Sequence, residues 1–137
     1  MADWASIQVG DKLPELKKKP GVTQLVKYAA GSGDFNPLHH DYNFPQAREI
    51  GSIIVHGRFK YASLGELVSN WLEHKGFIRK ITCQYRGMDF PDKEFVCRGE
   101  VTKKYEEGGQ KIVEISMYTQ NEAGQQTTPG TAVVVFK

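Results

Sequence analysis

One long segment of the chain carries apolar side chains at the spacing of an α-helix. Between residues 58 and 75, at about 100° per residue, one face collects Tyr61, Leu64, Leu67, Val68, Trp71 and Leu72. The opposite face collects Glu66, Ser69, Asn70 and Glu73. Gly76 is a natural stop after such a helix. The pattern predicts a long amphipathic helix whose apolar face needs a partner.

After Gly76 the pattern changes to alternating and β-branched residues, which is typical of strands. The predicted strands span residues 77–85, 95–104, 110–120 and 131–136. Turn residues separate them, and Gly108-Gly109 and the stretch 121–124 both suggest hairpins. Four consecutive strands supply the partner that the helix needs. The sequence therefore predicts an α+β fold, with a mostly antiparallel sheet curled around one long helix.

The N-terminal part of the chain is less regular. Residues 1–20 are predicted to form an extended lead-in with at most a short strand. A short helix is expected over residues 24–30, with Thr23 as its N-cap and Gly31 and Gly33 at its end. A long irregular stretch follows from Ser32 to His56, with a helical turn at residues 46–49.

Length and composition narrow the class of protein. A chain of 137 residues with 39% hydrophobic and 25% charged residues fits one globular domain, residues 1–137. A net charge of +2 and a longest basic run of three lysines (residues 17–19) argue against nucleic-acid binding. No stretch resembles a signal peptide or a membrane span. Cys83 and Cys97 are expected to be reduced thiols, and a cytoplasmic location is expected.

The irregular stretch gathers residues suited to acid–base chemistry. Asp34 and His39 are five residues apart with Asn36-Pro37 between them, and this dipeptide turns the chain. Folding back over the turn brings a carboxylate and an imidazole around one small molecule, such as water. Such a pair can exchange protons near neutral pH.

Gly57 begins the long predicted helix and is the third candidate residue. The first amides of a helix have no partner within it, and the helix dipole favours negative charge there. Because glycine has no side chain, a substrate carbonyl can approach its amide closely. This is the geometry of an oxyanion hole.

The histidines His39, His40 and His56, together with Asp41, raise the question of a metal site. Adjacent residues of an extended loop point in different directions, and further ligands at suitable spacing are lacking. No metal is therefore expected. His56 is expected to position the loop before Gly57.

The run Gly33-Asp34-Phe35-Asn36-Pro37-Leu38-His39-x-Asp41, followed by Ile54-Val55-His56-Gly57, resembles the motif of the MaoC-like, (R)-specific enoyl-CoA hydratases. The resemblance extends over essentially the whole chain. It implies a hot-dog fold, dimers formed by joining two sheets, and an acyl thioester of coenzyme A or acyl carrier protein as substrate. It implies no metal or redox cofactor.

The resemblance also assigns roles. Asp34 and His39 would hold and activate water, with Asp34 as the base and His39 passing a proton towards the α-carbon, while the Gly57 amide polarises the thioester carbonyl. The candidate substrate-binding residues are Asn36, which also holds the loop, and His56, Arg58 and Lys60.

The chain departs from the family pattern at Arg58, where an apolar residue is usual, and at Gly65, where some relatives carry serine. Three interpretations of Arg58 and Lys60 stay open: binding of an acidic acyl end, binding of coenzyme A phosphates, or simple surface exposure. Two other functions also stay open. One is a hot-dog thioesterase, and the other is a non-catalytic or partner-dependent subunit that binds acyl-CoA.

Overall fold

The computed structural model describes residues 2–137 and contains three α-helices, one 3-10 helix and five strands. In chain order they are β1 (Leu16–Lys18), α1 (Val22–Ser32), the 3-10 helix η1 (Pro37–His39), α2 (Pro45–Ile50), α3 (Gly57–Leu72), β2 (Gly76–Cys83), β3 (Phe95–Glu107), β4 (Gln110–Asn121) and β5 (Gln126–Phe136).

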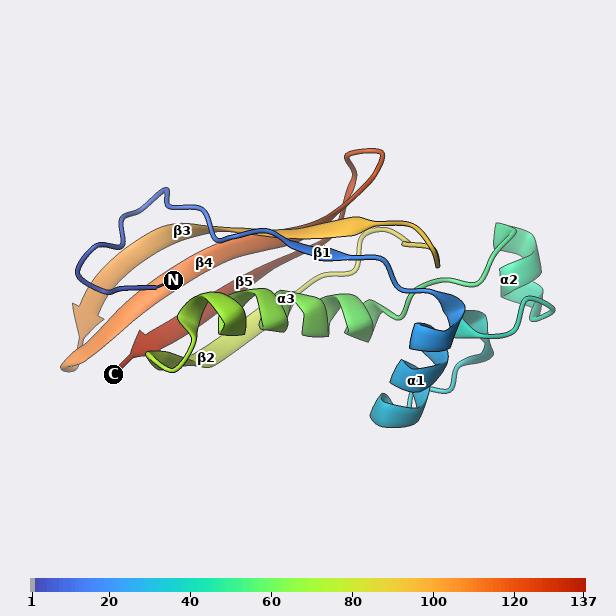
Figure 1. The fold of residues 1–137 in the computed structure, drawn as a ribbon, viewed down its shortest axis with the longest axis horizontal. Helices are drawn as coiled ribbons and strands as arrows, with labels where there is room; N and C mark the ends of the chain where they lie inside the picture. The colour runs from blue at the N-terminus through green and yellow to red at the C-terminus, as the bar shows by residue number, and fades with distance from the viewer. Residues whose placement is uncertain (1) are drawn as a thin grey trace.

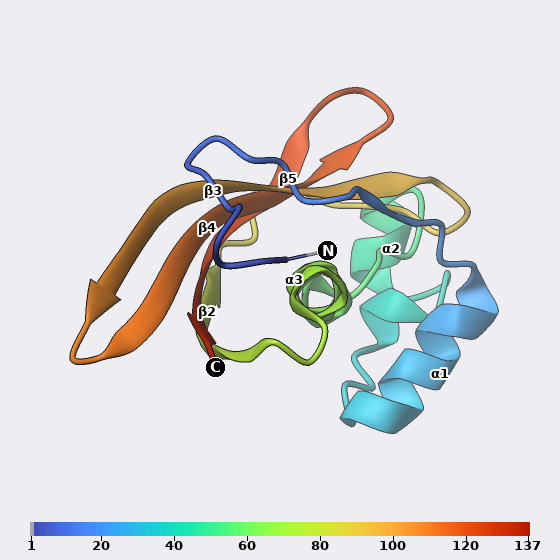
Figure 2. The same ribbon diagram turned by 60° about the vertical axis from the view of Figure 1, so that its left-hand side comes forward.

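The five strands form one antiparallel sheet in the order β1-β3-β4-β5-β2. Figure 1 shows α3 lying along the concave face of this sheet, and Figure 2 shows the sheet curling around the helix. The helices α1 and α2 lie beyond the N-terminal end of α3, whereas the C-terminus and the first described residue, Ala2, lie near its other end (Figure 1). The α+β architecture predicted from the sequence is confirmed.

The curvature of the sheet has a local cause. The pairing register shifts once in each of three strand pairs, between Ile78 and Lys80, between Val101 and Lys103, and between Thr119 and Gln120. An extra residue on one strand bends it and increases its twist. The sheet can therefore wrap α3 instead of lying flat on it.

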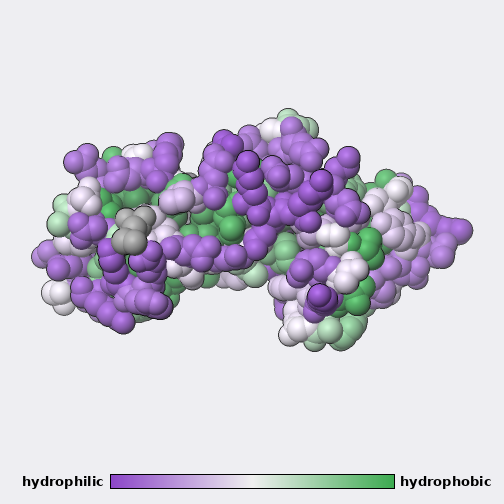
Figure 3. All heavy atoms as spheres, in the orientation of Figure 1, coloured by the Kyte–Doolittle hydropathy of each residue, from purple (hydrophilic) through white to green (hydrophobic). Residues whose placement is uncertain are grey.

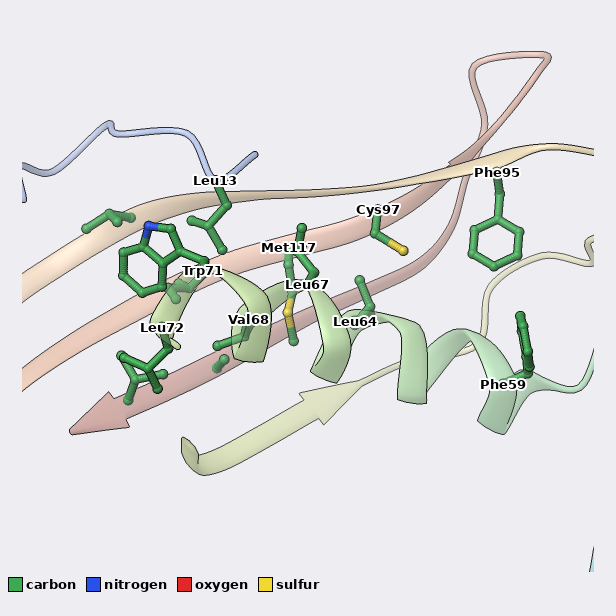
Figure 4. Packing of buried hydrophobic residues seen from close by; sticks show 14 of the residues in the cluster. Leu13, Phe59, Leu64, Leu67, Val68, Trp71, Leu72, Phe95, Cys97 and Met117 are labelled. Atoms are coloured by element: carbon green, nitrogen blue, oxygen red, sulfur yellow. The ribbon is translucent and has the colours of Figure 1, made fainter. Parts of the chain in front are cut away.

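The core lies between α3 and the sheet. Alternate residues of β3 point inwards, as the two-residue period of a strand requires, and Phe95, Cys97 and Val101 are almost fully buried. Figure 4 shows residues of this core facing the apolar side of α3. Of the six residues expected on that side, all but the half-buried Tyr61 are buried, and they are Leu64, Leu67, Val68, Trp71 and Leu72. This packing fixes the axis of α3 and thereby the place of its first residue, Gly57.

Two helix boundaries differ from the sequence prediction. Helix α1 begins at Val22 after Gly21, which has no side chain to cap it, so the predicted Thr23 N-cap is wrong. Helix α3 ends at Leu72, and the next residue, Glu73, leaves the helical conformation with φ of 54° and ψ of −128°. Gly76 is instead the first residue of β2, where a Cβ atom would lie 2.2 Å from the carbonyl oxygen of Val135.

Strand β5 is longer than predicted. It starts at Gln126, five residues before the predicted start, and includes Pro129 and Gly130. Proline and glycine are unfavourable in strands and mask the pattern. Gly130 is required by close packing, since a Cβ atom there would lie 2.3 Å from the carbonyl oxygen of Thr82 on β2.

Within residues 2–137, no helix has the length and apolar character needed to cross a bilayer. Cys83 and Cys97 are both free thiols. Polar side chains cover most of the face drawn in Figure 3, and apolar ones are visible between them over the middle of the molecule.

A buried ion pair connects α3 to the segment between β2 and β3. The ammonium of Lys60 lies 3.0 Å from the carboxylate of Asp89 and donates a 2.9 Å hydrogen bond to the carbonyl of Gly87. The two side chains are only 2% and 4% exposed. Asp89 also accepts a 2.5 Å hydrogen bond from the hydroxyl of Thr127, which in turn contacts that of Thr119. Of the three interpretations left open for Lys60, simple surface exposure is therefore wrong.

We predict that Lys60→Met lowers the free energy of unfolding by about 3 kcal/mol or more, because it leaves the Asp89 carboxylate buried without its counter-charge. The double variant Lys60→Met/Asp89→Asn should be more stable than the single variant. Lys12→Met, which removes an exposed ion pair with Glu100, should change stability by less than about 1 kcal/mol. Urea denaturation measures all three, and equal losses in the Lys60 and Lys12 variants would contradict this prediction.

Candidate active site

The loop between α1 and α2 brings together the acid and the imidazole predicted from the sequence. Gly33 ends α1 in the left-handed conformation, with φ of 76°. The Asn36 side chain then accepts a 3.1 Å hydrogen bond from the amide of Leu38 and caps η1, which ends at His39. As a result, a carboxylate oxygen of Asp34 and ring nitrogens of His39 and His56 all lie within 4.8 Å of one another.

The orientation of the His39 ring follows from its backbone partner. Its Nδ1 lies 2.8 Å from the carbonyl oxygen of Ile54. Because a carbonyl oxygen only accepts hydrogen bonds, Nδ1 carries a proton and donates it. The other nitrogen, Nε2, is therefore the atom of His39 that can exchange a proton with a ligand.

His56 contacts both the ring of His39 and the backbone of Asp34. It is completely buried, and its ring stacks on that of His39 with centroids 4.0 Å apart and an angle of 24°. Its Nε2 donates to the backbone carbonyl of Asp34 at 3.2 Å, and the ring of Tyr28 contacts it edge-on. Burial, followed by the nearby charge of His39, lowers the pKa of His56. His56 is therefore neutral at neutral pH and holds the backbone of Asp34.

Gly57 is the first residue of α3, and no side chain caps this end of the helix. Within residues 2–137, its amide has no hydrogen-bond acceptor outside the helix. The ring of Tyr85 covers its α-carbon, since a Cβ atom at Gly57 would lie 3.0 Å from two ring carbons. Burial is the main cause that raises the pKa of Tyr85 to about 12, so this phenol is neutral. The site thus has an unpaired backbone donor beside a neutral aromatic wall.

A pocket of about 800 Å³ opens at this end of the helix. The structure places Asp34, Gly57, Arg58 and Lys60 in its wall, together with Ile54, Val55, Tyr85, Arg86, Gly87, Met88, Phe90 and Gln125. His39, Asn36 and His56 are not in this wall. His39 and His56 are buried, with ring nitrogens within 4.8 Å of the Asp34 carboxylate that lines the pocket, and Asn36 is exposed on the loop.

Asp34, His39 and His56 are residue types that bind metals, and one ligand atom of each lies within 4.8 Å of the others. The two rings are stacked, so their nitrogens lie in nearly parallel planes. One nitrogen of each ring is also occupied by a backbone carbonyl. A metal site needs its donors directed at a common centre. The same groups can exchange protons, which is the chemistry that the sequence predicts for Asp34 and His39.

Three residues of the site were not predicted from the sequence: Tyr85 over Gly57, Arg86 beside it, and Asp89, the partner of Lys60. All three follow β2 and reach the site only through the sheet, so local patterns could not place them. For Asp89 alone, the sequence contained an indirect sign, namely the position of its partner Lys60. Lys60 precedes Leu64 by one helical turn and thus falls on the buried face, where a lysine needs an acidic partner.

Comparison with known proteins identifies the family. The family model described as "MaoC like domain" matches residues 8–123. The (R)-specific enoyl-CoA hydratase of Aeromonas caviae is 31% identical over 130 residues, which cover 94% of this chain and 95% of that protein. The fatty acid synthase subunit beta of Saccharomyces cerevisiae is 36% identical over 67 residues, which are 47% of this chain but 3% of that much longer protein.

Solved structures agree in fold. The (R)-hydratase from A. caviae involved in PHA biosynthesis has a TM-score of 0.87 and 27% identity, and the match covers 96% of this chain and 98% of that one. An unliganded R-hydratase from Pseudomonas aeruginosa, at 22% identity, shows the same fold with a TM-score of 0.84 over 97% of this chain and 84% of that one. The chain therefore belongs to the MaoC-like family and has the hot-dog fold.

Proposed function

We propose that this protein is a hydro-lyase that adds water reversibly to trans-2-enoyl thioesters of coenzyme A or acyl carrier protein and forms the (R)-3-hydroxyacyl product. The observation that carries the proposal is the approach of the Asp34 carboxylate to the His39 ring, beside a pocket that also contains Gly57. The (R) configuration rests on the similarity to the A. caviae hydratase.

In the proposed reaction, a water molecule lies between Asp34 and Nε2 of His39. Asp34 takes a proton from the water molecule, and the oxygen of this water bonds to C3 of the enoyl chain. The electrons of the C2–C3 double bond move towards the thioester carbonyl, and the Gly57 amide stabilises the resulting enolate. The proton taken from the water then passes from Asp34 to Nε2 of His39, and His39 delivers it to C2, so that both side chains end in their starting protonation states. Dehydration is the same path in reverse.

We propose that the reaction uses no metal or redox cofactor. Hydration needs a base, an acid and a donor to the carbonyl, and Asp34, His39 and Gly57 supply these three functions. The fixed Nδ1–H of His39 and the neutral, buried His56 hold the proton-transfer groups in place. Such preorganisation is what general acid–base catalysis requires of its surroundings.

We also propose that two copies join through β2. Among residues 2–137, this strand pairs with β5 alone and forms one edge of the sheet, while β1 covers part of the other edge. An unpaired strand edge exposes backbone donors and acceptors, and pairing with a second copy satisfies them. Light scattering should give the mass of a homodimer, and the mass of one chain would contradict this proposal.

We predict that Asp34→Asn and His39→Asn each lower kcat by roughly 100-fold or more, because each removes a proton-transfer group. The side-chain amide introduced by His39→Asn can keep the bond to Ile54 while Nε2 is lost. His40→Asn, at the exposed neighbouring position, is the matched control and should retain activity. Loss of the conjugated-thioester absorbance of a short enoyl-CoA measures the rate. Full activity in either of the first two variants would exclude that residue from the mechanism.

We predict that Gly57→Ala lowers kcat/KM by roughly 10-fold or more, because the methyl group obstructs approach of the carbonyl to the amide. The methyl also meets the Tyr85 ring, so Gly57→Ala/Tyr85→Ala separates the two effects. The double variant should stay impaired relative to Tyr85→Ala. Recovery to the level of Tyr85→Ala would mean that Gly57 serves only to accommodate the tyrosine ring.

A further inference from the structure

Two arginines give the pocket an excess of positive charge. Arg58 and Arg86 line it and are exposed, and neither forms an ion pair within residues 2–137. Asp34 is the one acidic side chain in the wall among these residues, and the charge of Lys60 is already neutralised by Asp89. An anionic group that enters the pocket would therefore meet two guanidinium groups and one carboxylate.

The turn that bears Arg86 is held rigidly. The amides of Arg86 and Gly87 donate to the carbonyl of Thr127 at 2.9 and 3.1 Å. Lys60 binds the carbonyl of Gly87 from the other side, and Asp89 fixes Lys60. The Arg86 guanidinium also donates to the Gln84 side-chain oxygen through Nε, at 3.0 Å, and through Nη2, which leaves Nη1 and the second Nη2 hydrogen for a ligand. Because the backbone is ordered on folding, a ligand need not supply that ordering when it binds.

Both arginines branch from the backbone beside the reaction site. Arg58 directly follows Gly57, and Arg86 directly follows Tyr85, whose ring rests on Gly57. With a thioester carbonyl on the Gly57 amide, the end of a short acyl chain would be within reach of both arginines, as would the first part of the pantetheine arm. The pantetheine arm separates the phosphates of coenzyme A or acyl carrier protein from the thioester.

We propose that the pocket selects short 2-enoyl thioesters whose acyl chain ends in a carboxylate, with Arg58 and Arg86 as the binding site for that carboxylate. This inference rests on the proposed hydration and narrows its substrate class. The planar guanidinium group matches a carboxylate through two parallel hydrogen bonds, which a neutral chain end cannot form. Of the three interpretations left open by the sequence for Arg58, the proposal selects binding of an acidic acyl end.

The test compares two enoyl-CoA substrates of equal chain length, one ending in a methyl group and the other in a carboxylate. We expect the wild-type kcat/KM to favour the carboxylate by roughly 10-fold or more, since charge-assisted hydrogen bonds are the strong ones. Arg58→Gln and Arg86→Gln should each shrink this ratio, and the double variant should abolish it. Arg48→Gln, an exposed arginine of α2 outside the pocket, should keep the ratio.

Equal losses on both substrates would overturn the proposal and assign the arginines to a shared group such as the phosphates. Thioesters of N-acetylcysteamine lack phosphates and therefore separate the acyl carboxylate from the carrier phosphates as the group bound. The kcat/KM preference for the carboxylate-ended chain must persist on them. Calorimetry with the saturated carboxylate-ended thioester of N-acetylcysteamine, which cannot be hydrated and has no phosphates, tests binding independently of turnover. Binding that weakens in Arg58→Gln supports the inference even if the hydration proposal fails, and binding that is insensitive to both arginines contradicts it.

Discussion

The site depends on how the sheet encloses α3. A helix with a strong apolar face is unstable alone and must bury that face, and here the curved sheet surrounds it. Once the helix axis is fixed, its uncapped first turn must emerge at one end of the sheet. The loop with Asp34 and His39 packs at that end through Ile54 and His56. The fold thus carries an unpaired backbone donor and an acid–base pair to one place.

The interior near the site is polar but electrically balanced. Lys60 and Asp89 neutralise each other, and burial keeps His56 neutral. A buried ion pair contributes little net stability, but removing one partner is costly. The ion pair instead fixes the position of Asp89, whose backbone carbonyl accepts a 2.8 Å hydrogen bond from the amide of Val55. The pair therefore ties the segment before β3 to the residues that lead into Gly57, so that the two walls of the pocket are held together.

Much of this arrangement was predictable from the sequence because it depends on local chemistry. The helical period identified the buried face of α3, and the Asn36-Pro37 turn predicted the approach of Asp34 to His39. What could not be predicted depends on tertiary contacts. Tyr85 lies over Gly57 only because β2 pairs with β5 at one particular register. Likewise, Thr23 is of a residue type suited to capping, but the helix starts before it, at Val22. The start of β5 was hidden because proline and glycine are unfavourable in strands, and Gly130 is required there only by the close approach of the Thr82 carbonyl on β2.

The central claim is that Asp34, His39 and Gly57 form a site that adds water to C3 of an enoyl thioester. Incubation with a trans-2-enoyl-CoA in ¹⁸O-labelled water, followed by chiral separation and mass spectrometry, tests this most directly. We predict one ¹⁸O atom at C3 of an (R)-3-hydroxyacyl-CoA, with the thioester intact. Release of free coenzyme A with ¹⁸O in the carboxylate, or an (S) product, would contradict it.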